Sequence, residues 1–204
     1  MKKTILNYVA KSLMVVAICG VGSFATAQDA QFGIKGGVNF SNIVGGDDRD
    51  NIDDENVLTS FHVGIFTQVG LSDVFYIQPE LLYTRKGTEL DLGAIGDTQL
   101  NLDYLELPIM FRIEVLETIN LEAGPYAAYL LNSKITNDNS SGAFELDTDD
   151  FRKLDYGVAI GAGLDLEVLE IGARYNYGLV SLSKNDEGID ARNSSLSAYV
   201  AFKF

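Results

Sequence analysis

The only histidine in the sequence, His62, lies two positions after Ser60. A histidine within hydrogen-bond reach of a serine can act as its general base, and this pairing is common in hydrolases and acyl transferases. No other catalytic motif accompanies the pair, and a serine near a single histidine is a frequent coincidence. The sequence therefore predicts no enzyme, no catalytic residue and no cofactor.

Two acidic segments are rich in possible oxygen ligands, GGDDRDNIDDEN (45–56) and ELDTDD (145–150). Neither has the ligand spacing of an EF-hand loop, so two interpretations stay open: solvation of exposed loops, or binding of divalent cations such as Ca²⁺. The whole chain has a net charge of −14 and no basic patch, which argues against nucleic acid as a partner.

The N-terminal segment 1–27, MKKTILNYVAKSLMVVAICGVGSFATA, has the layout of a secretory signal peptide. Basic residues come first, a short apolar run follows, and Ala25-Thr26-Ala27 is a small-residue cleavage site. The apolar run is too short to span a membrane as a helix. We therefore expect residues 28–204 to form the mature protein, which contains no cysteine because Cys19 is removed.

The rest of the chain has an apolar residue at every second position over long stretches, the period of a β-strand. Eight such stretches are present: 32–40, 61–71, 75–84, 105–113, 121–131, 155–167, 169–179 and 194–204. No linker or change of composition divides them, so we expect a single domain.

The two faces of these strands differ in a way that favours a membrane barrel over a soluble sandwich. The apolar face has no charged residue in any of the eight stretches, and a charge at a bilayer midplane costs about 2–4 kcal/mol. The other face is rich in glycine, which fits side chains converging inside a narrow closed barrel better than an open surface in water. Ten glycines lie on that face: Gly33, Gly37, Gly64, Gly70, Gly124, Gly157, Gly161, Gly163, Gly172 and Gly178.

The connections between the strands alternate strictly in length. Tight joins are expected at 71–75, 115–119 and 167–169, and long ones at 43–59, 87–102, 132–153 and 180–194. Outer-membrane barrels have such short periplasmic turns and long extracellular loops. The prediction is an all-β fold, an eight-stranded antiparallel up-and-down transmembrane β-barrel with both termini in the periplasm. Leu100 and Leu102 are out of phase with Leu105 and Leu107, which indicates a bulge or a strand end near Tyr104.

Several segments resemble a family of small outer-membrane β-barrel proteins of Gram-negative bacteria, called porin-like or PorT-like and similar in architecture to the transmembrane part of OmpA. They are YIQPELLYTRKG (76–87), LDYLELPIMFR (102–112), EAGPYAAYLL (122–131), DYGVAIGAGLDLE (155–167) and GARYNYGL (172–179). The resemblance implies contact with outer-membrane lipid. It also implies that Phe202 and Phe204, in the terminal strand, form the signal read by the barrel-assembly machinery.

An eight-stranded barrel has an interior that side chains fill, so charges there must be paired. We expect a buried network in which Arg112 and Arg174 sit among the carboxylates. Its members are Lys35, Glu80, Glu106, Arg112, Glu122, Asp155 and Arg174; Asp165, Glu167, Glu170 and Lys203 also point inward by register. The network is either packing in a polar core or a narrow gated path for ions.

Residues 43–59, 87–102, 132–151 and 180–194, in the expected loops, hold −13 of the net charge of −17 for residues 28–204, which leaves a rim suited to solvation or to contact with other molecules. The function predicted from the sequence is a non-enzymatic scaffold in the cell outer membrane that displays these acidic loops. The alternative is a porin-like narrow channel for small solutes or ions, and a helper role in secretion follows only from the family labels.

Overall fold

A computed structural model describes residues 30–44, 57–91, 97–137, 144–145, 153–181 and 192–204. The predicted signal peptide, residues 1–27, lies outside these residues, as do most of the acidic loop segments. Eight strands form one closed wall: β1 (Ala30–Val44), β2 (Leu58–Gly70), β3 (Phe75–Asp91), β4 (Asp97–Leu116), β5 (Ile119–Asn137), β7 (Leu154–Leu166), β8 (Leu169–Gly178) and β9 (Arg192–Lys203). The two-residue strand β6 (Phe144–Glu145) pairs only with β5.

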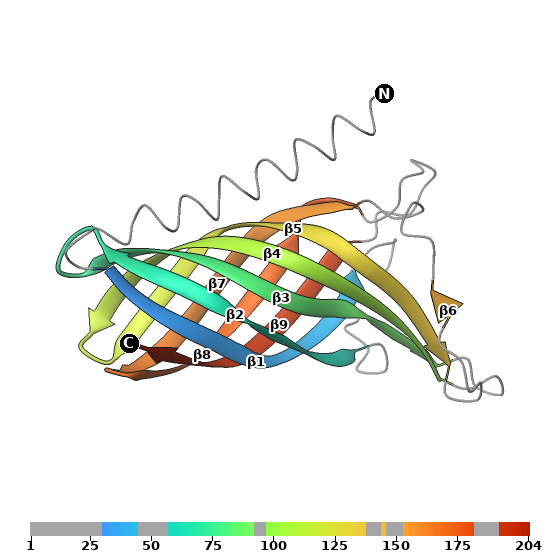
Figure 1. Cartoon of the computed structure of the whole chain (residues 1–204), viewed down its shortest axis with the longest axis horizontal. Coiled ribbons are helices and arrows are strands. Elements are labelled where there is room, and N and C mark those ends of the chain that lie inside the picture. Colours follow the sequence, from blue (N-terminus) through green and yellow to red (C-terminus); the bar gives the residue numbers. More distant parts are fainter. Residues whose placement is uncertain (1–29, 45–56, 92–96, 138–143, 146–152, 182–191) are drawn as a thin grey trace, which may run out of the picture.

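Every neighbouring pair of strands is antiparallel, and the order around the wall is β4-β3-β2-β1-β9-β8-β7-β5. The β4–β5 pairing closes the ring (Figure 1). Closure leaves no open edge whose backbone groups would lack partners in lipid. The predicted eight-stranded antiparallel up-and-down barrel is therefore confirmed. Among the described residues, no helix is long and apolar enough to cross a membrane.

The three short connections lie at one end of the barrel, which also holds the start of β1 and Phe204 (Figure 1). They are residues 71–74, 117–118 and 167–168, as the sequence predicts. The expectation of a long connection at 87–102 is wrong, because β3 continues to Asp91 and β4 begins at Asp97. The strands β3, β4 and β5 therefore extend beyond the rest of the wall at the far end (Figure 1).

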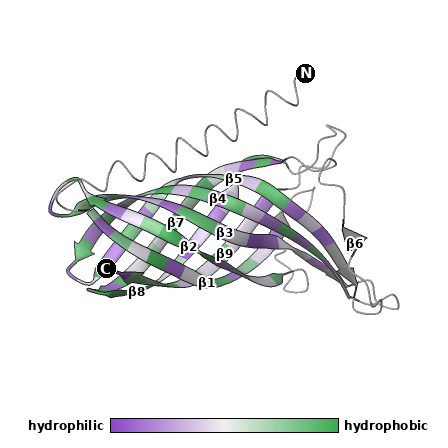
Figure 2. Ribbon diagram, viewed as in Figure 1, coloured by the Kyte–Doolittle hydropathy of each residue, from purple (hydrophilic) through white to green (hydrophobic). Residues whose placement is uncertain are grey.

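Alternation between the two faces is visible along the strands in Figure 2. On β2, Val63 and Ile65 are half exposed, whereas Phe66 on the opposite face is buried. Apolar side chains cover the outside because that face is suited to lipid, and polar side chains occupy the interior.

The polarity of the two faces inverts near the far end of β4. Leu102 is fully buried inside the barrel, while Asn101 and Asp103 lie on the other face, where Asp103 is covered by its partner Arg85. This arrangement, apolar inside and polar outside, is that of a sheet in water. The band of outward-facing apolar side chains, which we call the apolar belt, therefore ends between Leu105 and Asp103 on β4. Tyr83 and Arg85 are the neighbouring residues on β3.

The inversion explains why Leu100 and Leu102 are out of phase with Leu105 and Leu107. The inward alternation of β4 runs unbroken through Leu102 and Tyr104, so the leucines simply change face. A register shift does lie between Asp103 and Tyr104, where β5 has the extra residue: Asp103 pairs with Asn132 and Tyr104 with Leu130. The predicted bulge near Tyr104 is therefore confirmed, with its extra residue, Leu131, on β5.

The inversion predicts different costs for one substitution at two outward positions of β2. Ile65→Arg places a charge within the apolar belt and should cost about 2–4 kcal/mol of unfolding free energy, whereas Thr59→Arg lies near the boundary and should cost about 0–1 kcal/mol. Denaturant unfolding of the barrel in phospholipid vesicles measures both. Equal costs would show that the apolar belt does not end between these two residues.

Candidate functional site

The barrel interior holds the candidate site, and Glu80 lies at its centre. The Lys35 ammonium is 2.7 Å from Glu80 Oε1, and the Arg174 guanidinium donates from Nη1 and Nη2 to the two carboxylate oxygens of Glu80, each at 2.8 Å. All three side chains are almost completely buried. A bidentate, charge-assisted pair of this kind is among the strongest polar contacts in proteins.

The Glu80–Arg174 pair crosses the full width of the lumen. Glu80 is on β3 and Arg174 on β8, and four steps separate these strands in either direction around the eight-stranded ring. The two side chains thus meet from diametrically opposite walls. A contact in this geometry occupies the axis of the barrel, where a path for solutes would run.

Glu122 and Tyr199 extend this central group. Arg174 Nε donates to Glu122 Oε1 at 2.8 Å, and the Tyr199 hydroxyl lies 3.4 Å from the same oxygen and donates to Glu170 at 2.9 Å. The Lys35 ammonium lies 4.0 Å from the centre of the Tyr199 ring, a cation–π contact. Each charge therefore has both an ionic and a hydrogen-bond partner.

A second set of charges lies nearer the end with the short turns. The Arg112 guanidinium is 2.9 Å from Glu170, and it also donates to Gln78 and, at 3.3 Å, to Gln68. Lys203 pairs with Asp165 and lies 3.9 Å from Glu170.

Taken together, the two groups balance in charge. Four cations, Lys35, Arg112, Arg174 and Lys203, meet four carboxylates, Glu80, Glu122, Asp165 and Glu170. Such compensation is what burial of charge in a narrow lumen requires, since an unpaired ion would cost several kcal/mol.

A third group lies toward the far end, where the interior becomes apolar. Lys86 is 2.5 Å from Glu106 and 4.4 Å from the centre of the Tyr126 ring, and Asp155 accepts from Asn193 at 2.9 Å. Around it lies a cluster of buried residues: Leu102, Tyr104, Met110, Tyr126, Ala128, Leu130 and Ala159. Asn193 also lies 3.4 Å from the Tyr104 hydroxyl, and since β9 and β4 are opposite strands, this contact too spans the lumen.

Inward-facing glycines make room for these long side chains. A Cβ added to Gly172 would lie 2.5 Å from the Tyr199 ring, and one at Gly157 would lie 2.7 Å from the Tyr126 ring. At Gly161 it would lie 2.8 Å from Glu122. The glycines therefore face the largest interior groups, as dense packing of a tapered interior requires.

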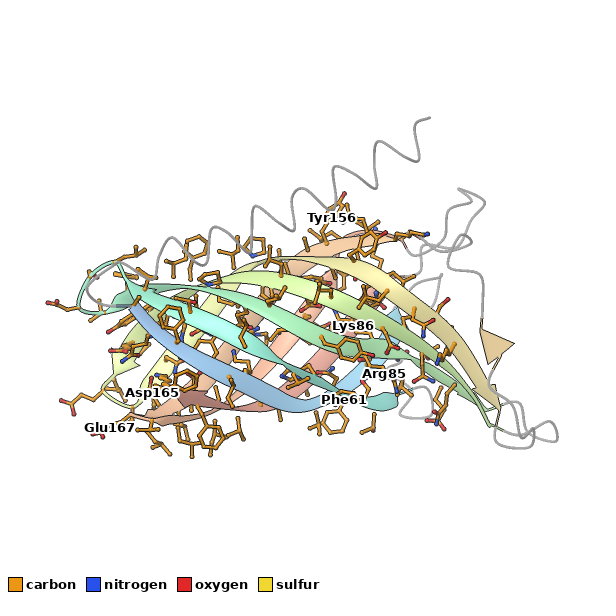
Figure 3. All side chains as sticks on the ribbon, viewed as in Figure 1. Phe61, Arg85, Lys86, Tyr156, Asp165 and Glu167 are labelled. Atoms are coloured by element: carbon orange, nitrogen blue, oxygen red, sulfur yellow. The ribbon has the colours of Figure 1, made fainter. Side chains whose placement is uncertain are left out.

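The structure brings together some of the residues named from the sequence and separates others. Arg174 contacts Glu80 and Glu122, whereas Arg112 contacts Glu170. Glu106 and Asp155 belong to the third group, away from both arginines, with Lys86 and Asn193 as partners. Glu167, expected to point inward, lies instead in the exposed β7–β8 turn with a φ of 68° (Figure 3).

Lys86 is a buried interior cation that sequence reasoning missed. It lies at an inward position two residues after Thr84, and Figure 3 labels it within the barrel beside Arg85, which faces outward and pairs with Asp103. The signal in the sequence was that every second residue of β3 continues to face inward past Thr84. The apolar residues that normally reveal such parity end there, at the boundary of the apolar belt.

His62 and Ser60 have other partners than each other. His62 Nδ1 lies 2.7 Å from Asn39 Oδ1, and the Ser60 hydroxyl donates to the Arg85 carbonyl at 2.7 Å. Within the described part of the chain, no group of three or more acidic, histidine or cysteine residues is placed to hold a metal ion. The acidic segments 45–56 and 145–150, considered for divalent cations, lie outside the described residues except for Glu145 in β6.

Phe202 and Phe204 lie at the end of the barrel that carries the short turns. Phe204 and Phe32 exchange two backbone hydrogen bonds, at 2.9 and 3.4 Å, so the residue that follows β9 is tied to β1. Both phenylalanine rings are exposed on the outer face, as aromatic residues at a membrane interface would be.

Comparisons with known proteins agree with this geometry. Residues 26–184 match the sequence family described as the outer membrane protein β-barrel domain. Neisserial surface protein A has a similar structure, with a TM-score of 0.55, 15% identity, and coverage of 87% of this chain and 100% of that one. Ail, the attachment invasion locus protein of Yersinia pestis, has a TM-score of 0.49, 14% identity and the same two coverages. No curated protein sequence matches the chain.

The buried ion pairs of Arg174 predict a large loss of stability when only one partner is replaced. Arg174→Met leaves Glu122 without its cation and removes one of the two cations of Glu80, so it should lower the unfolding free energy by about 3–5 kcal/mol. Adding Glu122→Gln should recover part of that loss, because the carboxylate left unpaired is then neutral. Denaturant unfolding of the single and double variants measures the coupling, and additive losses would contradict it.

Proposed function

The chain is a member of the outer-membrane protein β-barrel family, and from that premise we propose that it is a non-enzymatic scaffold whose extracellular loops act by surface interaction. The observation that carries the proposal is the Glu80–Arg174 contact across the lumen. A lumen crossed by a buried, bidentate ion pair favours a closed barrel over a conducting one.

The second crossing, Tyr104 with Asn193, supports the same proposal. Together with the buried apolar cluster around Leu102, it adds a second layer on the far side of the central ion pairs, in which apolar side chains surround the Lys86–Glu106 pair. To cross the barrel, a hydrated ion would have to displace the side chains of both layers. The scaffold role then lies in the loops, whose acidity keeps them solvated and available for contact outside the cell.

The orientation we propose puts both termini and the short turns in the periplasm. It is supported by the family and by the usual placement of short turns and long loops in such barrels. In this orientation Phe202 and Phe204 lie at the periplasmic interface, where the barrel-assembly machinery would meet them. Outer-membrane lipid contacts the apolar belt.

The alternative function is a narrow channel. It is favoured by the polar side chains that line the lumen between the short turns and the two contacts that cross it, Glu80–Arg174 and Tyr104–Asn193. Single-channel recording of the refolded mature protein in a planar bilayer separates the two functions. We expect no current steps from protein that a heat-shifted gel band shows to be folded. Reproducible steps whose size changes in Arg112→Ala or Arg174→Ala would identify a channel and contradict the scaffold.

Orientation can be tested with a single cysteine, since the expected mature chain has none. Ser72→Cys, in the exposed β2–β3 turn, should react with a membrane-impermeant maleimide only after the outer membrane is permeabilised. Ser140→Cys, in the expected loop 132–153, is the matched control and should react in intact cells. The reverse pattern would place the turns outside the cell.

A further inference from the structure

At the end of the lumen beside the short turns, the inward-facing residues of successive strands that lie nearest these turns form a ring. Six of its members are Tyr76, Glu114, Asn120, Asp165, Glu170 and Lys203. We refer to this ring as the turn-end mouth. Asp165 lies at this end of the barrel in Figure 3, next to Glu167 of the β7–β8 turn.

Negative charge exceeds positive charge at the turn-end mouth. Lys203 is shared between Asp165 and Glu170, and Arg112 from the layer above also pairs with Glu170. Among the described residues, no cationic side chain forms an ion pair with Glu114. Three further carboxylates on the turns, Asp73, Glu117 and Glu167, are exposed just outside the mouth.

Asn120 is the independent observation that points to a ligand. Its side chain is 1% exposed, yet neither its amide nitrogen nor its amide oxygen has a hydrogen-bond partner. Leaving a buried polar group unpaired costs about 1–3 kcal/mol. Both atoms lie 3.1 Å from where a Cβ on Gly163 would stand, and Glu170 Oε1 lies 3.0 Å from the same point. The amide and the carboxylate thus converge beside Gly163, in a space where even a Cβ would require one of these side chains to shift.

We propose that the turn-end mouth binds a basic segment of a periplasmic protein, with one Lys or Arg side chain entering beside Asn120 and Glu114. The periplasmic location rests on the orientation given under Proposed function. An ammonium group has three donors, which suits an amide oxygen and neighbouring carboxylates. The exposed turn carboxylates attract the rest of the segment. A metal ion fits less well, because no group of three or more candidate ligands is placed to hold one among the described residues.

The experiment uses the mature protein refolded in lipid nanodiscs, where both ends of the barrel are accessible whatever its orientation in the cell. A fluorophore on Ser72→Cys reports binding at the turns, and the probe is a lysine-only peptide that carries a quencher. We expect saturable quenching. Asn120→Leu, which changes no charge, and Glu114→Gln should each weaken the binding about tenfold or more, since each removes a charge-assisted hydrogen bond.

Glu167→Gln is the matched control, because it removes the same charge from the exposed turn and should weaken binding only slightly. Folding of each variant is checked by heat-shifted migration, and Asn120→Leu should melt no lower than the parent because it removes an unpaired amide. Unchanged affinity in Asn120→Leu and Glu114→Gln, or an equal loss in Glu167→Gln, would show non-specific attraction and overturn the proposal. Conductance does not enter this readout, so failure of the scaffold function and failure of this site are distinguishable.

Discussion

Compensation of charge in a lumen filled by side chains is the constraint on which the rest of the structure depends. Glu80 can be buried because Lys35 and Arg174 reach it from two other strands, one of them on the opposite wall. That contact ties β1, β3 and β8 together in addition to the backbone ladder. It also requires small residues where long side chains converge, which accounts for glycines opposite Tyr199 and Glu122. The ion pairs and the glycines are therefore two parts of one packing solution.

The membrane sets a second constraint, and the inversion of polarity along β4 records where it ends. Below the boundary, Leu105 and Leu107 face outward and Glu106 faces inward; beyond it, Leu102 faces inward and Asp103 outward. The same inward–outward alternation thus lets one strand, β4, face lipid along one part and water along the other. The far end of the lumen can be apolar because the sheet there is surrounded by water on its outer face, so its hydrophobic residues pack inward as in a soluble protein.

The fold was predictable from the sequence because period-two alternation and turn spacing are local signals, and the eight strands and three tight turns follow from them. The length of β3 and β4 was not, because alternation was read only from outward apolar residues, and these stop at Tyr83 and Leu105. The sequence predicted that the candidate site contains buried, paired charges, but not which residues pair. Register shows that Arg112 and Glu170 face inward, yet strand tilt and stagger decide that Arg112 meets Glu170 while Glu106 meets Lys86.

The distribution of charge along the lumen separates a structural part from a part that is open to partners. Where four cations meet four carboxylates and two contacts cross the axis, the interior is self-sufficient, and any ligand would have to replace contacts that are already made. At the turn end the balance fails, at Glu114 in charge and at Asn120 in hydrogen bonding. Buried polar groups without partners are rare in native proteins because they lower stability. Other buried side chains, such as Glu122 and Asn176, leave one polar atom without a partner, whereas Asn120 leaves both of its amide atoms without one, and a ligand at the turn-end mouth would contact this amide.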